Sequence, residues 1–257
     1  MTGAAQPALE ARGLVKRYGG LDVLSGVDLS VHTGEVLALV GPSGCGKSTL
    51  LGILSGLLSA DAGSLDVAGV PARCFAQWQR IAYMFQEDRL LPWRSVRDNV
   101  ALGLEGQGLG RAQRAQRVDE ALRMVGLLHV ADAWPHELSG GMRSRVALAR
   151  SVAVLPAVLL MDEPFSKLDP QTRAQMHAQL LRIHAGSGTT VVFVTHDMEE
   201  AVVLADRIVR LVPSPGRIAE VIELGDLPRP RDPVAQGVAE RVRDLRARMV
   251  MGPEGLQ

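Results

Sequence analysis

Gly41-Pro42-Ser43-Gly44-Cys45-Gly46-Lys47-Ser48-Thr49 is the stretch that decides the fold of this 257-residue chain. This phosphate loop (41–49) fits the pattern G-x-x-x-x-G-K-[ST], in which glycines let backbone N–H groups face phosphate oxygens. We expect Lys47 to reach the β- and γ-phosphates of a nucleotide and the Ser48 hydroxyl to bind Mg²⁺. The nearly all-apolar run 35–40 leads into the loop, as a buried parallel strand does.

The elements that we expect around the loop mix strands and helices. Strands are expected at 9–18 and 23–31, and the second alternates apolar and polar positions as a half-buried antiparallel strand does. A helix is expected at 47–58, a strand at 81–85, and a helical, Arg-rich subdomain at about 87–155 with the glycine-broken stretch 103–110 inside it. The remaining core elements are a strand at 157–161, a helix at 171–184, a strand at 189–194, a helix at 198–205 and a strand at 208–211. This order predicts an α/β fold with a helical insertion.

Three regions are expected along the chain. Residues 1–8 are expected to be a flexible N-terminus, 9–226 the main domain, and 227–257 a linker followed by an amphipathic helix. The linker is L-P-R-P-R-D-P at 227–233, and the helix is indicated by an apolar stripe of Val238, Val242, Leu245 and Met249. The stripe either docks on its own domain or binds a partner or a membrane surface.

Charge, length of apolar runs and cysteine usage narrow the class of protein. Lys+Arg and Asp+Glu both number 28, so a whole-protein basic field for nucleic acid is absent. The sequence contains no run of about 18 apolar residues, so we expect no membrane-spanning helix. The first residues lack the pattern of an export signal. Two cysteines, Cys45 and Cys74, fit a reducing cytosol. We interpret Cys45 as a small residue that fits the loop, with a redox role as the alternative.

An acidic pair, Asp162 and Glu163, ends the apolar run 157–161. We expect Asp162 to hold Mg²⁺, through water, as the acidic partner of such loops does. We expect Glu163 to polarise the attacking water. The alternative is that Glu163 only caps or solvates the end of the strand.

Leu138-Ser139-Gly140-Gly141-Met142 lies between the phosphate loop and the acidic pair. Very few enzymes with a phosphate loop have a second nucleotide-contacting turn in this place. This Ser-Gly-Gly turn (138–142) cannot easily reach a nucleotide held by the loop of its own chain. It therefore suggests that two copies share the ATP, and that hydrolysis is tied to opening and closing of a dimer.

These motifs resemble those of the ATP-binding-cassette (ABC) ATPases, and the resemblance covers nearly all of the chain. It implies a P-loop NTPase fold with an N-terminal antiparallel β subdomain and an inserted α-helical subdomain, with 9–226 as the ABC ATPase domain. It also implies an ATPase that uses ATP and Mg²⁺. The residues expected to contact the nucleotide are Tyr18, Gly41, Pro42, Ser43, Gly44, Cys45, Gly46, Lys47, Ser48, Thr49, Ser139, Gly140, Gly141 and Asp169.

The resemblance also assigns roles to single residues. Tyr18 matches the aromatic residue that stacks on adenine, and its alternative is an ordinary half-buried strand tyrosine. Gln86 follows a strand, as the family's Mg²⁺- and water-contacting glutamine does, so Ser48, Gln86 and Asp162 form the expected metal set. His196 is similar to the switch histidine that bonds the γ-phosphate, so Glu163, His196 and Gln86 form the expected catalytic set. A structural histidine is the alternative for His196.

The chain departs from the family's pattern at two positions. In Ser166-Lys167-Leu168-Asp169, which falls where the family's D-loop crosses the dimer interface, Lys167 stands where a small residue is usual. This cation alters the coupling between two ATP sites or points into solvent. Ser144 occupies a position that is often glutamine in importers, which removes a longer hydrogen-bonding arm.

The run after Gln86 indicates which kind of ABC protein this is. In the post-glutamine segment (87–96), Leu90, Leu91 and Trp93 follow a loop that should face outward, where apolar surface implies a partner. Burial within the helical subdomain is the alternative. Together with Pro164-Phe165-Ser166 and the Pro-Gly-Arg turn at 215–217, the segment resembles the nitrate/sulfonate/taurine group of bacterial importers, in which it receives the permease's coupling helix.

This resemblance implies an ATP-hydrolysing importer subunit at the cytoplasmic face of the cell membrane. Its implied partners are a second copy of the chain, membrane permease subunits and, indirectly, a periplasmic solute-binding protein, with no nucleic acid. One cassette without a membrane span disfavours a fused exporter, and the absence of sustained heptads disfavours a repair-type coiled coil. The alternatives are a soluble regulatory or nucleic-acid-associated ABC ATPase, and an ATPase that serves lipid trafficking.

Overall fold

The computed structural model describes residues 7–250, which divide into two compact units. Unit 1 comprises residues 7–78 and 190–250 of those described, and unit 2 comprises 79–189. Residues 1–6 of the predicted flexible N-terminus and 251–257 of the predicted tail lie outside the described residues, whereas Pro7 and Ala8 already belong to the first strand. Within 7–250, no helix combines the length and the apolar composition that a membrane crossing requires.

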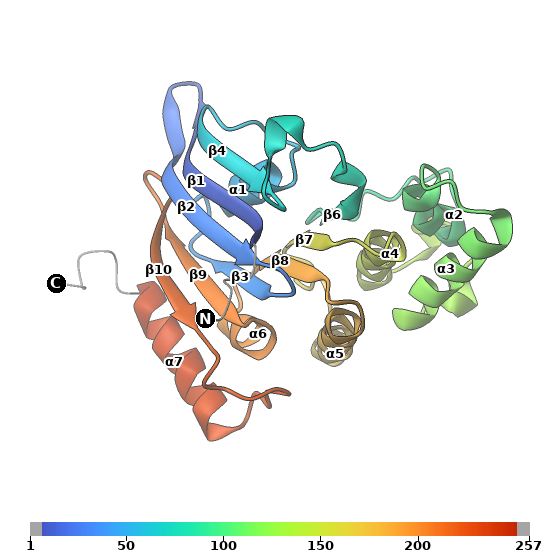
Figure 1. The fold of residues 1–257 in the computed structure, drawn as a ribbon. Helices are drawn as coiled ribbons and strands as arrows, with labels where there is room; N and C mark the ends of the chain where they lie inside the picture. The colour runs from blue at the N-terminus through green and yellow to red at the C-terminus, as the bar shows by residue number, and fades with distance from the viewer. Residues whose placement is uncertain (1–6, 251–257) are drawn as a thin grey trace, which may run out of the picture. The chain divides into compact units, whose positions relative to one another are not determined.

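Unit 1 contains an antiparallel sheet in the order β2-β1-β4-β5 (Figure 1). Its strands are β1 (Pro7–Tyr18), β2 (Leu21–His32), β4 (Ala62–Val67) and β5 (Val70–Pro71). Alternate residues of β2, such as Val27, Leu29 and Val31, are buried, as the alternating sequence predicts. The expected antiparallel pairing of the first two strands is confirmed.

Unit 1 also contains the strand that leads into the phosphate loop. This strand, β3 (Val36–Val40), is wholly buried and lies parallel to both β8 (Thr190–Val194) and β9 (Arg207–Val212). The strand β10 (Arg217–Glu223) pairs antiparallel with β9. Helices α1 (Lys47–Leu54) and α6 (Met198–Leu204) follow β3 and β8 respectively. The prediction of a buried parallel strand before the loop is confirmed.

Helix α1 is shorter than predicted. It ends at Leu54 rather than at residue 58. Gly56 adopts a φ of 75°, outside the helical region, and the Ser55 hydroxyl donates to the Gly52 carbonyl at 2.8 Å. A glycine two residues beyond a helix, with a serine that bonds back to the preceding turn, ends the helix there.

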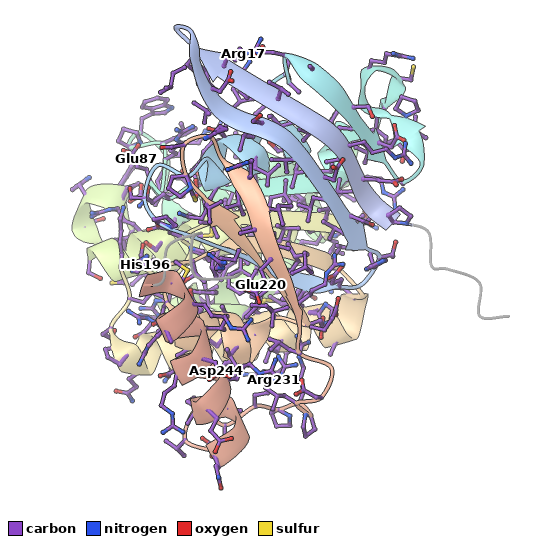
Figure 2. All side chains as sticks on the ribbon, turned by 90° about the vertical axis from the view of Figure 1, so that its left-hand side faces the viewer. Arg17, Glu87, His196, Glu220, Arg231 and Asp244 are labelled. Carbon is purple, nitrogen blue, oxygen red and sulfur yellow. The ribbon has the colours of Figure 1, made fainter. Side chains whose placement is uncertain are left out.

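The C-terminal helix α7 (Gln236–Val250) packs on the rest of unit 1 through the predicted stripe. Val238, Val242 and Leu245 are buried, and α7 contacts α6. In the linker, the buried Arg231 guanidinium donates hydrogen bonds to backbone carbonyls of α6 and of the chain after β10, while Asp244 of α7 is exposed (Figure 2). The apolar stripe therefore docks on its own domain, which was the first of the two alternatives.

Unit 2 combines two parallel strands with four α-helices and several short 3-10 turns. Strands β6 (Ile81–Met84) and β7 (Val158–Asp162) pair in parallel, with Met84 opposite Met161. Helices α2 (Val96–Ala101), α3 (Arg111–Met124) and α4 (Gly140–Ala153) pack on one another, as Figure 1 shows, and α5 (Pro170–Ser187) follows β7. The apolar residues Val100, Leu122 and Val146 lie in the core of this helical group. The helical stretch expected between the two strands is thus present.

Candidate nucleotide site

The phosphate loop connects β3 to α1 in unit 1, and its conformation depends on glycine. Gly46, the N-cap of α1, has a φ of 94°, and a Cβ there would lie 2.6 Å from Leu24 Cδ2. Gly44 has a φ of 77°. As a glycine, the N-cap residue Gly46 has no side chain that could accept a hydrogen bond from the first N–H groups of α1. These groups and the helix dipole form the cradle that an anion requires.

Lys47 holds the loop together from inside. Its side chain is buried, and Nζ donates to the Gly41 carbonyl at 2.8 Å and to the Pro42 carbonyl at 2.9 Å. By contrast, Ser43, Gly44 and Ser48 are exposed. The ammonium group therefore lies at a fixed place within the loop, while the backbone and the Ser48 hydroxyl remain accessible to a phosphate group and a cation.

Cys45 lies in the same loop with a fully buried side chain, and its Sγ is 3.8 Å from Lys47 Nζ. Burial raises the pKa of the Cys45 thiol, and the nearby Lys47 charge opposes that rise only in part. The thiolate is the reactive form. The arrangement supports the interpretation of Cys45 as a small residue that fits the loop.

We expect thiol alkylation to distinguish the two cysteines. In the native protein at pH 8, iodoacetamide should modify the exposed Cys74 and leave Cys45 unmodified until the chain is unfolded, because Cys45 is buried and protonated. Peptide mass spectrometry after timed alkylation gives the two rates. Equal rates in the folded protein would contradict the burial and protonation of Cys45.

His196 and Tyr18 lie at strand ends in unit 1. His196 follows β8 and is exposed (Figure 2), and the neighbouring Thr195 N–H donates to the Leu39 carbonyl of β3 at 3.2 Å. Because β3 and β8 are parallel, His196 leaves the sheet at the edge where the phosphate loop begins. Tyr18 ends β1 with 48% of its surface exposed, so its ring is not held in the core.

The acidic pair and Gln86 meet in unit 2. Asp162 ends β7 and is buried, whereas Glu163 is partly exposed. Gln86 Nε2 donates to Glu163 Oε2 at 3.0 Å. The contact arises because Gln86 and Glu163 follow the parallel strands β6 and β7 at the same edge. Burial, and then the charge of Asp162, raise the pKa of the neighbouring Tyr83, which stays neutral beside the acid.

Glu163 has a backbone conformation that is rare for its residue type. Its φ is 47°, in the left-handed region, where such a residue costs about 1–3 kcal/mol. The Ser166 hydroxyl donates to the Glu163 carbonyl at 3.0 Å and supports the turn. Strain of this kind gathers at functional sites, where a fixed side-chain direction matters more than local stability.

The Ser-Gly-Gly turn forms the start of α4 in unit 2. The exposed Ser139 is the N-cap, and its Oγ accepts a hydrogen bond from the Met142 N–H at 3.2 Å. Leu138 is buried and anchors the turn. Because Ser139 Oγ serves the cap as an acceptor, its own hydrogen can still be donated to a phosphate oxygen.

The structure shows where Ser144 and Lys167, the two residues that depart from the family's pattern, lie. Ser144 is buried, and its hydroxyl donates to the Gly140 carbonyl at 3.2 Å, so its short arm acts within α4. Lys167 is exposed. Asp169 caps α5 by accepting from the Thr172 N–H at 3.0 Å. Hydrogen bonds from the Thr172 side chain and then from its backbone lower the pKa of Asp169.

Trp93 dominates the surface of the post-glutamine segment. Its side chain is 69% exposed, Pro92 is exposed, and Leu90 and Leu91 are partly exposed. The alternative of burial within the helical group is wrong for Trp93. A wide aromatic surface held in solvent is typical of a residue that meets a partner.

One residue that supports the loop was not predicted. Gly216 lies so close to the loop that a Cβ would be 2.4 Å from the Cys45 carbonyl oxygen and 2.5 Å from that of Val23. Its N–H donates to the Val23 carbonyl at 3.0 Å. The Pro-Gly-Arg pattern at 215–217 predicts a turn, but nothing in the sequence pairs that turn with a loop so far away along the chain.

Comparisons with known proteins agree with these features. The family described as ABC transporter matches residues 24–166. The chain is 45% identical, over 94% of its length and 79% of the relative, to the aliphatic sulfonates import ATP-binding protein SsuB 2 of Xanthomonas axonopodis pv. citri. It is 47% identical, over 92% of its length and 79% of the relative, to the aliphatic sulfonates import ATP-binding protein SsuB of Cupriavidus necator.

Solved structures give the same result for the fold. A dimeric ATP-binding cassette in a post-hydrolysis state with ADP and Pi is 29% identical, with a TM-score of 0.77 over 84% of this chain and 98% of that chain. The CbiO1 protein of Clostridium perfringens, part of an ABC transporter complex, is 27% identical, with a TM-score of 0.78 over 95% of this chain and 97% of that chain. The predicted α/β P-loop fold is confirmed, and the chain belongs to the ABC transporter family of ATPases.

Proposed function

We propose that the chain is the ATP-hydrolysing subunit of a bacterial importer for a small sulfonate-like anion, held against membrane permease subunits at the cytoplasmic face. The observation that carries this proposal is the similarity of more than nine-tenths of the chain to curated subunits of aliphatic sulfonate importers. The exposed Trp93 supports it, because such a subunit needs an apolar surface for the permease.

Binding of ATP rests on the phosphate loop. Lys47 and the backbone N–H groups of the loop hold the phosphates, and Tyr18 offers the face of its ring to the adenine. The exposed Ser48 hydroxyl, the Gln86 amide and the Asp162 carboxylate supply the oxygen ligands that Mg²⁺ prefers. Gln86 gives its Nε2 to Glu163 at 3.0 Å, which leaves Oε1 for a cation. Mg²⁺ held by these residues would supply positive charge that stabilises the phosphates.

Glu163 is the general base for the attacking water. Its carboxylate accepts a hydrogen bond from Gln86 and lies on a backbone fixed in the left-handed region, so its direction is set before the nucleotide arrives. His196 donates to the γ-phosphate. Glu163 positions the attacking water and His196 positions the γ-phosphate. Such positioning about a highly charged substrate is the main contribution of a protein to phosphoryl transfer.

The Ser-Gly-Gly turn completes the site of a second copy. Ser139 Oγ–H and the N–H groups at the start of α4 bind the γ-phosphate held by the partner's loop, and Asp169 lies where the partners cross. Because ATP bridges only the closed dimer, its differential affinity shifts the population toward closure. Hydrolysis removes the bridge, and the dimer reopens and returns the permease to its other state.

The permease contact predicts a large effect of Trp93. We expect Trp93→Glu to weaken binding to the permease subunits about tenfold or more, because an exposed aromatic anchor becomes a charge that must be buried. The measurement is the fraction of the chain that co-purifies with its co-expressed permease from membranes. Val221→Glu in β10 is the matched control, since Val221 is 47% exposed and lies outside the segment.

The same experiment separates the alternatives. Recovery of the wild-type chain as a free protein, with the permease present, would favour a soluble regulatory ATPase and overturn the importer proposal. In the reconstituted complex with its binding protein, aliphatic sulfonates should stimulate ATP hydrolysis. Stimulation by lipid instead would indicate the lipid-trafficking alternative.

A further inference from the structure

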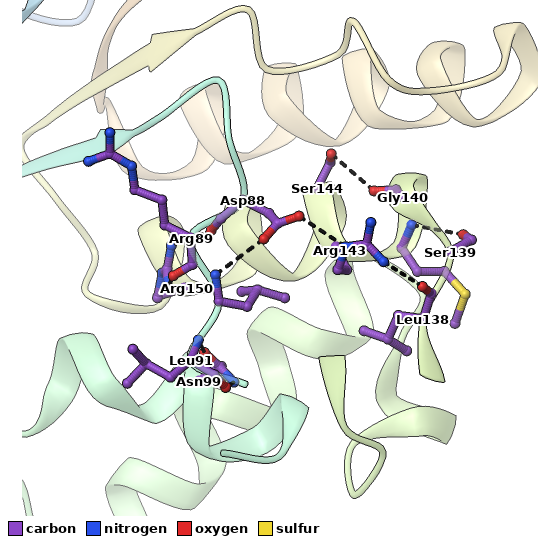
Figure 3. Close-up of polar contacts among 12 residues, drawn as sticks. Asp88, Arg89, Leu91, Asn99, Leu138, Ser139, Gly140, Arg143, Ser144 and Arg150 are labelled. Atoms are coloured by element: carbon purple, nitrogen blue, oxygen red, sulfur yellow. Dashed lines mark hydrogen bonds and ion pairs between the residues drawn. The ribbon is translucent and has the colours of Figure 1, made fainter. Parts of the chain in front are cut away.

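The beginning of the post-glutamine segment is held on α4 by an arginine (Figure 3). Arg150 Nη2 donates to the Asp88 carbonyl at 2.8 Å, and Nη1 donates to the Arg89 carbonyl at 2.9 Å. Arg89 itself has a φ of 46°, which is a strained conformation for a residue with a Cβ. The hydrogen bonds from Arg150 hold this strained turn in place, so the path of the segment is set by α4 rather than by the segment alone.

A buried asparagine of α2 holds the next part of the segment. The Leu91 N–H donates to Asn99 Oδ1 at 2.7 Å, and Asn99 Nδ2 lies 3.1 Å from the Leu91 carbonyl oxygen, to which it donates. Asn99 itself is fully buried. The backbone of the segment is therefore fixed to helices α2 and α4 of unit 2. A partner that pushes on the exposed Trp93 cannot move this backbone independently of the two helices.

Arg143 connects this segment to the Ser-Gly-Gly turn. Its Nε donates to Asp88 Oδ2 at 3.0 Å, and its Nη1 donates to the Leu138 carbonyl at 2.8 Å (Figure 3). The other carboxylate oxygen of Asp88 accepts from the Leu90 N–H at 3.2 Å. Leu138 immediately precedes Ser139, the cap of α4. One planar guanidinium therefore touches both the segment and the turn.

We propose that Asp88 and Arg143 are positioning residues that transmit a displacement of the post-glutamine segment to Ser139. The inference rests on the proposed function, because the displacement comes from the permease. The rigid plane of Arg143 suits this role, since its two donating edges cannot move independently as the donors of a flexible side chain can. Movement of the Asp88 carboxylate turns the guanidinium and shifts the carbonyl that anchors the Ser-Gly-Gly turn.

The first test uses the free chain and measures hydrogen exchange at the Met142 amide, which Ser139 caps at 3.2 Å. Loss of the pair in Asp88→Ala should speed this exchange about tenfold, because a hydrogen bond between charged groups then no longer holds Arg143. Asp119→Ala, which removes the ion pair of Asp119 with Arg97 elsewhere in the helical group, should leave it at the wild-type rate. An unchanged rate in Asp88→Ala would overturn the proposal whether or not the chain binds a permease.

The second test is a double-mutant cycle in the assembled transporter, with stimulation of ATP hydrolysis by the permease and solute as the readout. Arg143→Ala removes both contacts of the guanidinium, and Asp88→Ala removes one of them together with the hydrogen bond from the Leu90 N–H, so the double variant should lose less than the sum of the two single losses. Each single variant should lower the stimulated kcat about tenfold while the KM for ATP stays within about twofold. The melting temperature of each variant should stay at the wild-type value, which separates this effect from a loss of folded protein. Additive losses, or full stimulation in Asp88→Ala, would contradict the transmission. A wild-type complex that fails to assemble would instead refute the proposed function.

Discussion

Glu163→Gln is expected to keep ATP binding, to lower turnover about a hundredfold or more, and to accumulate as an ATP-bound dimer. The substitution keeps the shape of the side chain and removes the carboxylate that accepts a proton from water. The neighbouring Gln86, whose Nε2 lies 3.0 Å from Glu163 Oε2, can still donate to the new amide oxygen. Phosphate release measures turnover, and size-exclusion chromatography with and without ATP measures the dimer.

A glutamate that belongs to no proposed site provides the control. Glu120 lies on α3 and accepts a hydrogen bond from Gln116 at 2.9 Å, so Glu120→Gln should hydrolyse ATP like the wild type. Turnover of Glu163→Gln at a comparable rate would show that Glu163 only ends a strand. That alternative, which the sequence left open, would then replace the assignment of a general base.

Gly216→Ala is expected to weaken ATP binding about tenfold or more, although residue 216 touches no nucleotide in the proposal. The added methyl group would lie 2.4 Å from the Cys45 carbonyl oxygen and 2.5 Å from the Val23 carbonyl oxygen. Both are backbone atoms that cannot rotate away, so the phosphate loop must shift and its N–H groups lose their alignment. Titration with a fluorescent ATP analogue gives the affinity, and the melting temperature reports whether the fold persists.

Gly225→Ala is the matched control for Gly216→Ala. Residue 225 follows β10, is exposed, and an added Cβ there meets no atom within 4 Å. Wild-type affinity in this control, with weakened binding in Gly216→Ala, would assign the effect to the close approach. Equal affinity in both variants would show that the loop tolerates movement at Cys45.

The parts of the site that could be predicted are those encoded over a few neighbouring residues. The phosphate loop needs only the apolar run before it, its glycines and the helix after it, and all three are consecutive in the chain. The same is true of the acidic pair at the end of β7. The Ser-Gly-Gly turn could be recognised because its five residues are consecutive in the chain.

The parts that could not be predicted depend on contacts between distant residues. Gly216 lies against Cys45 of the phosphate loop, far away along the chain. Arg143 binds Asp88, which lies 55 positions earlier. A glycine pattern or a charged pair carries no information about its distant neighbour. Strands β4 and β10 were missed because their exposed faces break the apolar pattern. The end of α1 was placed too late because the conformation of Gly56 decides it.

The proposal that two copies share each ATP is tested most directly by mixing two variants in the Glu163→Gln background. One carries Lys47→Ala, which removes the phosphate-binding ammonium, and the other carries Ser139→Arg, which blocks the Ser-Gly-Gly turn. Alone, neither should form a dimer with ATP, because every shared site lacks one half. The mixture should form an ATP-dependent heterodimer, since the loop of one variant and the turn of the other make one complete site. A mixture that stays monomeric with ATP, while the Glu163→Gln parent dimerises, would contradict the shared site.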